Sequence, residues 1–137
     1  MSAAPDHVYR LRTRWNDADA NGVLNNAVVL TLFEEARRAL CEEAGLFETP
    51  DVFPFLLAST RVDYLRPGRG GVAVDVELTT TRLGTSSFEQ SYRVLPADGG
   101  EPWAVGEATL VCIDAASGKS RPMSPVFRAA LGEDASG

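Results

Sequence analysis

Residues 14–44 read RWNDADANGVLNNAVVLTLFEEARRALCEEA, a polar turn that leads directly into one long helical pattern. The first part of this stretch is rich in Asn, Asp and Gly, which are residues that favour turns. In the second part, apolar side chains recur at three- and four-residue steps, as they do on one face of a helix. Asn25 or Asn26 can cap the start of this helix, and Gly45 is a typical stop. The stretch therefore predicts a helix over about 26–44.

The rest of the chain alternates apolar and polar residues, which is the pattern of half-buried strands. This alternation first runs from Val8 to Trp15, with every second side chain, Trp15 included, on the apolar face. Short Gly-containing breaks separate the last three stretches of this kind, which makes them antiparallel neighbours. One strand, a long helix and four further strands predict an α+β fold in which one helix packs against one antiparallel sheet. The four later strands are expected at about 55–65, 72–83, 86–94 and 103–114.

Length and charge limit the kind of protein. The 137 residues fit one domain, which we expect to span 1–137, with a core at about 7–127 and a polar tail at 132–137. The formal net charge of −6 disfavours binding to nucleic acid. No apolar run is long enough to span a bilayer, and the first ten residues carry no apolar signal core. We therefore expect a cytoplasmic protein with neither a nucleic-acid nor a membrane partner.

Few side chains are suited to catalysis or to metal binding. His7 is the single histidine and precedes the patterned segments, so neither a Ser-His-Asp triad nor a multi-histidine metal site is expected. Cys41 and Cys112 are the two cysteines; both lie in apolar patterns and they form no CxxC pair, which favours buried thiols. We expect no metal and no cofactor, and chemistry that rests on carboxylates, hydroxyls, amides and backbone groups.

The segment that opens the helix carries a motif of a known family. Residues 14–27, RWNDADANGVLNNA, and residues 33–37, FEEAR, resemble the 4-hydroxybenzoyl-CoA thioesterase branch of the hot-dog superfamily. That branch has an aromatic residue, D-x-D, a glycine with aliphatic residues, and then E-x-A-R in the helix. Residues 62–67, VDYLRP, and 84–88, GTSSF, resemble its later strands. The resemblance implies a long central helix wrapped by a five-stranded antiparallel sheet, and homodimers or homotetramers with active sites between subunits.

The same resemblance implies that the protein is an acyl-CoA thioesterase. It places the catalytic carboxylate at Asp19, the second Asp of D-x-D, and gives Asp17 a structural role. It also places near Asn26 a backbone N–H that polarises the thioester carbonyl. Arginines that follow the helix could meet the phosphates of CoA. The expected substrate contacts are Gly22, Arg61, Arg66, Arg69, Ser86 and Ser87.

The chemistry of thioester hydrolysis is consistent with these positions. The reaction needs a nucleophile or base, and a group that holds the charge developing on the carbonyl oxygen. Asp19 precedes a helix whose first N–H groups lack intrahelical partners and carry the positive end of the helix dipole. Asp19 would either attack the thioester directly or activate a water. An Asp in such a turn is also a common cap of backbone N–H groups. The Asn26 side chain is either a helix cap or a substrate contact. Glu35 is an alternative to Asp19 as the catalytic base.

Three other functions stay open as hypotheses. The first is a non-catalytic module that binds acyl thioesters. The second is a thioesterase that acts on acyl-carrier-protein thioesters, although the charge of −6 would repel an acidic carrier unless the arginines cluster. The third is a dehydratase, which would need a catalytic histidine and is disfavoured by the position of His7.

Overall fold

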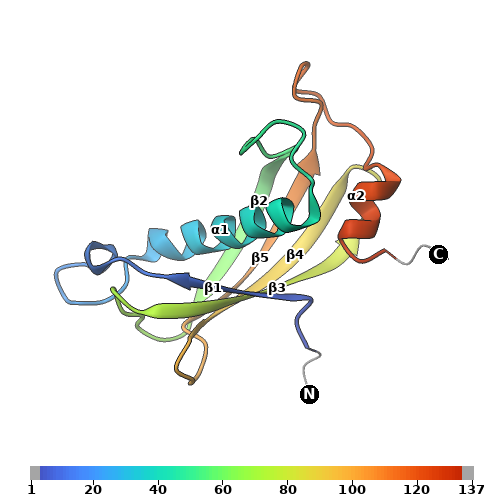
Figure 1. Cartoon of the computed structure of the whole chain (residues 1–137). Helices are drawn as coiled ribbons and strands as arrows, with labels where there is room; N and C mark the ends of the chain where they lie inside the picture. The colour runs from blue at the N-terminus through green and yellow to red at the C-terminus, as the bar shows by residue number, and fades with distance from the viewer. Residues whose placement is uncertain (1–3, 134–137) are drawn as a thin grey trace.

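The computed structural model describes residues 4–133, so residues 134–137 of the expected tail lie outside the described residues. One long helix lies across one face of a single sheet (Figure 1). In chain order the elements are β1 (His7–Arg12), a short 3-10 turn (Trp15–Asp17), α1 (Asn26–Ala44), β2 (Phe55–Tyr64), β3 (Ala73–Leu83), β4 (Ser87–Pro96), β5 (Ala104–Cys112) and α2 (Pro125–Ala130).

The five strands form one antiparallel sheet in the order β1-β3-β4-β5-β2. The strands β3, β4 and β5 follow one another through short connections and lie side by side in the middle. The two strands that flank α1 in the sequence, β1 and β2, lie at the opposite edges. This arrangement confirms the predicted α+β hot-dog fold.

The predicted helix over 26–44 is confirmed as α1, and both of its ends follow from local chemistry. Of the two candidate caps, Asn25 is the one used, because its side-chain oxygen accepts the backbone N–H of Ala27 at 3.0 Å. Gly45 ends the helix with φ of 68°, a left-handed conformation that glycine adopts without steric cost.

The core lies between α1 and the inner face of the sheet. Phe33 of α1 stacks on Tyr92 of β4, with the ring centroids 4.6 Å apart. Alternate residues of β3 and β4 are buried on this face, as expected for a sheet with one buried face. Each large apolar side chain in this layer stabilises the fold by about 1.5–3 kcal/mol through its burial. The strand residues are Val74, Val76, Leu78, Phe88, Tyr92 and Val94.

A chain of buried hydrogen bonds crosses this core. Arg37 of α1 is only 7% exposed, and its Nη1 donates to the Tyr92 hydroxyl at 3.1 Å. That hydroxyl donates to Gln90 Oε1 at 2.6 Å, and Gln90 Nε2 donates to the Thr80 hydroxyl at 3.2 Å. A buried polar group without a partner costs about 1–3 kcal/mol. These bonds therefore join α1 to β4 and β3 at one defined position.

The strand predicted from Val8 to Trp15 is too long. β1 ends at Arg12. The Thr13 N–H still donates to the Val72 carbonyl at 2.9 Å, but the Val72 N–H donates to the Thr13 hydroxyl at 3.1 Å, so a side chain takes the place of the ladder acceptor. Trp15 begins the 3-10 turn and is 86% exposed, so it does not continue the buried face. The sequence placed His7 before the patterned segments, but it is the first residue of β1. Its ring stacks on that of Tyr9 in the same strand.

Helix α2 was not predicted. It is short, and its start has two ordinary signals: the Ser124 hydroxyl oxygen accepts the N–H of Phe127 at 3.1 Å, and Pro125 occupies the first helical position. The apolar pattern of so few residues was too short to be distinguished from a loop. Phe127 packs edge-on to Phe55 and closes one end of the core.

The edge strand β2 is open to solvent along most of its length. It pairs with β5 on one side, and its side chains from Leu56 onward are largely exposed. Leu56 is 58% exposed and Leu57 is 48% exposed. A long unpaired strand edge that exposes apolar side chains such as these can pair with another strand.

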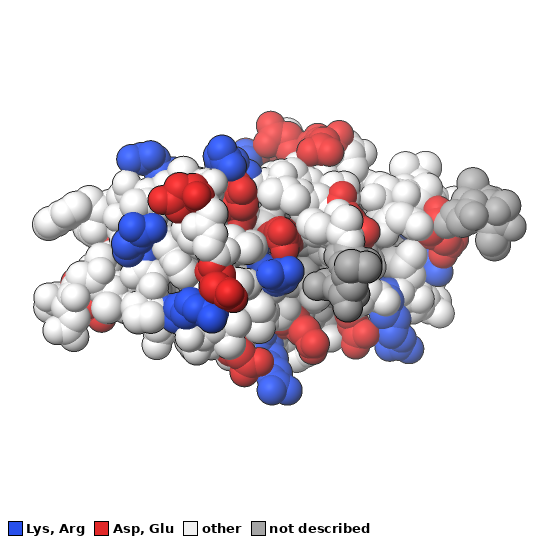
Figure 2. Space-filling view, turned by 90° about the horizontal axis from the view of Figure 1, so that it is seen from below, with Lys and Arg blue, Asp and Glu red and all other residues white. Residues whose placement is uncertain are grey.

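On the face seen in Figure 2, the charged residues do not segregate by sign. Figure 2 shows Lys and Arg interspersed with Asp and Glu on one face. No helix within residues 4–133 is both long and apolar enough to cross a membrane. In the same residues, no three His, Cys, Asp or Glu side chains lie close enough together to hold one metal ion. The cytoplasmic location stays a prediction from the sequence.

Candidate active site

Three loops, residues 13–25, 65–72 and 97–103, meet beside the amino-terminal end of α1. The N–H of Leu24 donates to the Gly68 carbonyl at 2.9 Å, which joins the first loop to the second. The N–H groups of Leu65 and Arg66 both donate to the Trp103 carbonyl, at 2.8 and 3.1 Å, which joins the second to the third. Backbone bonds thus set where the D-x-D turn lies relative to the end of β2.

Gly68 is a point of close approach between these loops. A Cβ atom at this position would lie 2.7 Å from Cε3 of Trp103 and 3.0 Å from Cβ of Leu24. Such distances are shorter than van der Waals contact, so only glycine lets the indole ring and Leu24 pack against the loop as they do.

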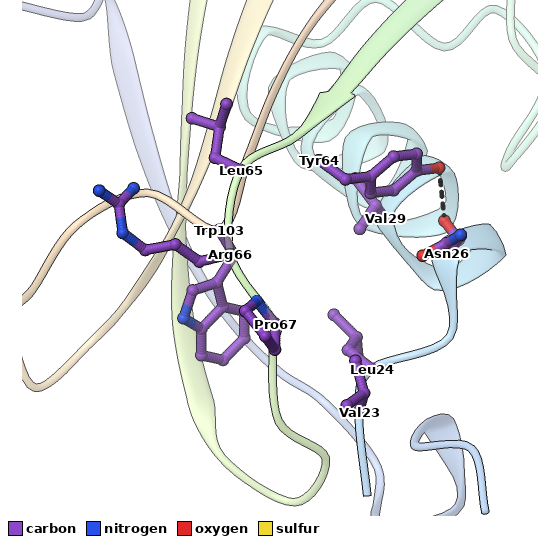
Figure 3. Close-up of a pocket in the computed structure, with 10 residues that line it drawn as sticks. Val23, Leu24, Asn26, Val29, Tyr64, Leu65, Arg66, Pro67 and Trp103 are labelled. Carbon is purple, nitrogen blue, oxygen red and sulfur yellow. Dashed lines mark hydrogen bonds between the residues drawn. The ribbon is translucent and has the colours of Figure 1, made fainter. Parts of the chain in front are cut away.

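A cavity of about 260 Å³ opens between these loops and the first turn of α1 (Figure 3). The Tyr64 side chain reaches from the end of β2 toward the helix, and its hydroxyl donates to the Asn26 carbonyl at 3.0 Å. Most of the lining is apolar, with polar groups at the helix start and at Arg66. The lining residues are Val23, Leu24, Asn26, Val29, Tyr64, Leu65, Arg66, Pro67, Gly68 and Trp103.

One backbone donor at the start of α1 is free. The Asn25 side chain accepts the N–H of Ala27, and the Asn25 carbonyl accepts the N–H of Val28 at 2.9 Å. The N–H of Asn26 donates to no group among residues 4–133. This donor belongs to a residue that lines the cavity, at the end of the helix where the dipole is positive.

Asp19 lies in the exposed turn that precedes the helix. Its Oδ1 accepts the N–H groups of Asn21 at 2.8 Å and of Val23 at 3.2 Å. Its backbone N–H donates to the Val23 carbonyl at 2.8 Å, and Gly22 closes the turn with φ of 75°. Within residues 4–133, Oδ2 accepts no hydrogen bond. Asp19 does not itself line the cavity, but it is bonded directly to Val23, which does.

Asp17 is buried and fully engaged. Its Oδ2 accepts the N–H of Arg14 at 2.7 Å, and its Oδ1 accepts the Nε and Nη2 of the same arginine at 3.1 and 3.0 Å. Its carbonyl accepts the N–H of Asn25 at 2.8 Å. The backbone hydrogen bond from Arg14 is the main cause that holds the pKa of Asp17 below its ordinary value, with the guanidinium acting in the same direction against the effect of burial.

The three arginines named from the sequence fall into two places. Arg66 lines the cavity, donates to the Pro102 carbonyl at 3.1 Å and lies 3.4 Å from a Glu101 carboxylate oxygen. Arg69 lies over the ring of Trp103, with its guanidinium carbon 5.9 Å from the ring centroid. Arg61 lies opposite Glu107 on β5 and lines a separate hollow of about 420 Å³.

Ser86 and Ser87 lie at the other end of the sheet. Ser87 is opposite Val111 near the end of β5, whereas Tyr64 is opposite Ala104 at its start. Within one subunit the structure therefore does not bring either serine to Asn26. Glu35, the alternative base, lines a third hollow together with Arg38, on a different side of α1 from the cavity.

Tyr64, Trp103 and Leu24 are among the residues of this site that sequence reasoning missed. Tyr64 could have been found, because it lies inside the VDYLRP segment that resembles the family. Trp103 carried no such signal, since a single tryptophan before a strand most often belongs to the core.

The fold and sequence comparisons agree with one another. A solved thioesterase from Thermus thermophilus, complexed with coenzyme A and Zn, superposes with a TM-score of 0.80 at 31% identity, over 95% of this chain and 100% of that chain. The PA5185 protein of Pseudomonas aeruginosa PAO1 superposes with a TM-score of 0.85 at 25% identity, over 93% of this chain and 90% of that chain.

Curated sequences give the same result. A 1,4-dihydroxy-2-naphthoyl-CoA hydrolase from Nostoc punctiforme is 35% identical over 115 residues, which are 80% of this chain and 75% of that protein. The model of the thioesterase-like superfamily matches residues 13–131, which include the D-x-D turn, α1 and the whole sheet after β1. The chain therefore belongs to the thioesterase-like superfamily.

Proposed function

We propose that this protein is an acyl-CoA thioesterase that hydrolyses an acyl-CoA to the free acid and CoA. The observation that carries the proposal is the free N–H of Asn26, a residue that lines a largely apolar cavity at the positive end of α1. A thioesterase of the same fold solved with coenzyme A, and relatives named as hydrolases of an aromatic acyl-CoA, support a CoA thioester as the substrate.

In the proposed reaction the thioester oxygen accepts the N–H of Asn26, which stabilises the negative charge that develops on that oxygen. Asp19 has one oxygen occupied by the turn and a second oxygen with no described partner, which is the one we assign to the chemistry. Asp17 is already fully bonded, and we assign to it the role of holding the turn.

Asp19 can take part in the reaction by two routes. In the first, a carboxylate oxygen bonds to the thioester carbon, the C–S bond breaks, and the CoA thiolate takes a proton from solvent; water then cleaves the acyl-aspartyl anhydride. In the second, Asp19 accepts a proton from a water whose oxygen bonds to the carbon. The C–S bond breaks, and the departing sulfur receives that proton.

Arg66, which lines the cavity, and Arg69, which lies over the ring of Trp103, suit the phosphates of CoA. Arg66 and Arg69 flank the loop beside Trp103, and guanidinium groups bind phosphates with charge-assisted hydrogen bonds. Arg61 is a candidate only for a portion of CoA that extends past the edge of the sheet, since it lines a different hollow.

We also propose that the active unit is a homodimer joined through β2, or a tetramer built from two such dimers. The exposed edge of β2 is unpaired in one subunit and carries Leu56 and Leu57. Antiparallel pairing of β2 with its copy would bring the Phe55 end of one sheet beside the Tyr64 end of the other. Ser87 of the partner subunit would then lie at the level of the cavity, which explains how these serines could contact the substrate.

Hydrolysis of a panel of aliphatic and aromatic acyl-CoAs, including 1,4-dihydroxy-2-naphthoyl-CoA, and of one acyl-carrier-protein thioester, tests the proposal. The wild type should hydrolyse at least one acyl-CoA. Asp19→Asn should fold normally, bind that substrate and turn it over about 100-fold more slowly or worse.

Each alternative has its own outcome in this experiment. Near wild-type turnover by Asp19→Asn would remove Asp19 from the chemistry and make Glu35 the next carboxylate to test. Turnover of the carrier-protein thioester alone would replace CoA as the substrate. Binding without turnover by the wild type across the panel would show a non-catalytic acyl-thioester-binding module.

A further inference from the structure

We propose that Tyr64 is a positioning and specificity-determining residue for the thioesterase reaction: its hydroxyl holds the first residue of α1, and its ring sets the width of the acyl cavity. This inference rests on the proposed function and goes beyond it, because it assigns two separable tasks to a residue outside the D-x-D turn.

The hydroxyl of Tyr64 bonds to the residue that supplies the proposed oxyanion donor. It donates to the Asn26 carbonyl at 3.0 Å, and the free N–H belongs to the same residue. No other side chain among residues 4–133 bonds to the backbone of Asn26. Helix ends fray, and an oxyanion donor contributes fully only when it is held to within about 0.5 Å of its productive position.

The ring of Tyr64 forms part of the cavity wall. It comes from the end of β2, while Val29 comes from α1 and Trp103 from the segment before β5, so the three side chains enclose the space from different elements (Figure 3). Trp103 and Val29 are buried, and their positions are set by the core. Tyr64 is 48% exposed and is not one of the buried core residues, so its replacement should disturb the core less than replacement of Val29 or Trp103.

The two tasks predict different effects for two substitutions. Tyr64→Phe keeps the ring and removes the bond to Asn26, so kcat should fall about tenfold while KM and the order of preference among acyl groups stay unchanged. Tyr64→Leu removes the ring as well, so it should show the same loss of kcat. In addition, it should shift kcat/KM toward bulkier acyl groups by about tenfold relative to the smallest one.

Tyr9→Phe is the matched control. The Tyr9 hydroxyl is buried without a hydrogen-bond partner among the described residues and lies on β1, outside the cavity. This control should leave kcat and acyl preference unchanged. All three variants and the wild type are compared for kcat, KM, acyl preference and melting temperature on the same acyl-CoA panel.

The results separate this inference from the proposed function. If the wild type hydrolyses no thioester on the panel, the proposed function fails. If the wild type is active, and Tyr64→Phe has wild-type kcat and Tyr64→Leu wild-type acyl preference, the assignment to Tyr64 is wrong. A kcat that falls only in step with the melting temperature, with the preference of both variants unchanged, would show a purely structural residue and would also overturn it.

Discussion

The Asp17 carboxylate accepts the backbone N–H of Arg14 at 2.7 Å and the Nε of the same residue at 3.1 Å. This contact closes the 3-10 turn from which the D-x-D loop begins. Because the hydrogen bonds favour the ionised carboxylate, with the backbone bond contributing most, the pKa of Asp17 in the folded protein is lowered from its ordinary value.

The first prediction concerns acid stability. In the unfolded chain Asp17 takes up a proton near pH 3.9. The folded state resists protonation, so the stability that Asp17 supplies is complete above that pH and is lost as the pH falls through the lower folded pKa. Asp17→Asn should lower stability by about 1–3 kcal/mol at pH 7 and should flatten the loss of stability toward pH 3.

Urea unfolding at a series of pH values from 7 to 3 measures this effect. Asp98→Asn is the control, because Asp98 is an exposed turn residue. Equal pH profiles for Asp17→Asn and the wild type would contradict the assigned role. Where the Asp17 variant is folded, its kcat should stay within a few-fold of the wild type, in contrast to that of Asp19→Asn.

The second prediction concerns Gly68. A methyl group there would overlap Trp103 and Leu24, so Gly68→Ala should cost about 1–3 kcal/mol of stability. Because the overlap is with the indole ring, the cost of Gly68→Ala should be smaller in a Trp103→Phe background. A double-mutant cycle by thermal or chemical unfolding measures the coupling. Additive effects would show that the loop moves away without involving Trp103.

The third prediction concerns the thiols. Both cysteines are buried, as the sequence indicated, and burial raises the pKa of Cys41 to about 12 and that of Cys112 to about 11. Only thiolates react quickly with iodoacetamide. At pH 8 the native protein should therefore stay unmodified and active, and the protein in denaturant should gain two adducts by mass spectrometry. Fast inactivation that substrate prevents would place a reactive thiol at the site.

The fourth prediction concerns assembly. Light scattering should show a dimer or tetramer, and Leu57→Glu on the open edge of β2 should shift it toward monomer with loss of activity. Val8→Glu is the control, since Val8 is similarly exposed, at 52%, on the opposite edge strand β1. A wild type that is monomeric and fully active at working concentration would rule out a shared site.

The elements that the sequence predicted well are those whose periodic pattern runs over many residues and whose ends carry local signals. The helix from Asn26 to Ala44 has both, because Asn25 caps one end and Gly45 closes the other. The end of β1 was misplaced because alternation continues through residues that leave the ladder. The strand stops where the Val72 N–H donates to the Thr13 hydroxyl, and a contact that distant in sequence leaves no local trace.

The candidate site was predictable only in part. The D-x-D turn and the helix start are local and were both located from the sequence. The cavity depends on loops that lie far apart in the chain, so Trp103 could not be placed in it beforehand. Arg61, Arg66 and Arg69 were grouped because they are close in sequence, but Arg61 is on a strand and the other two follow its end.

The buried bonds from Arg37 through Tyr92 to Gln90 restrict the rotation of α1 about its own axis. Each residue turns an α-helix by about 100°, so a slip of one position would carry the guanidinium away from the Tyr92 hydroxyl. Apolar contacts alone would tolerate such a slip better, since they are not directional. Arg37 lies about three helical turns from Asn26. By fixing the rotation of α1 it also fixes the direction, about the helix axis, in which the free N–H of Asn26 points. Exchanges among the apolar side chains of α1 that keep Arg37 and Tyr92 should therefore leave the direction of that donor unchanged.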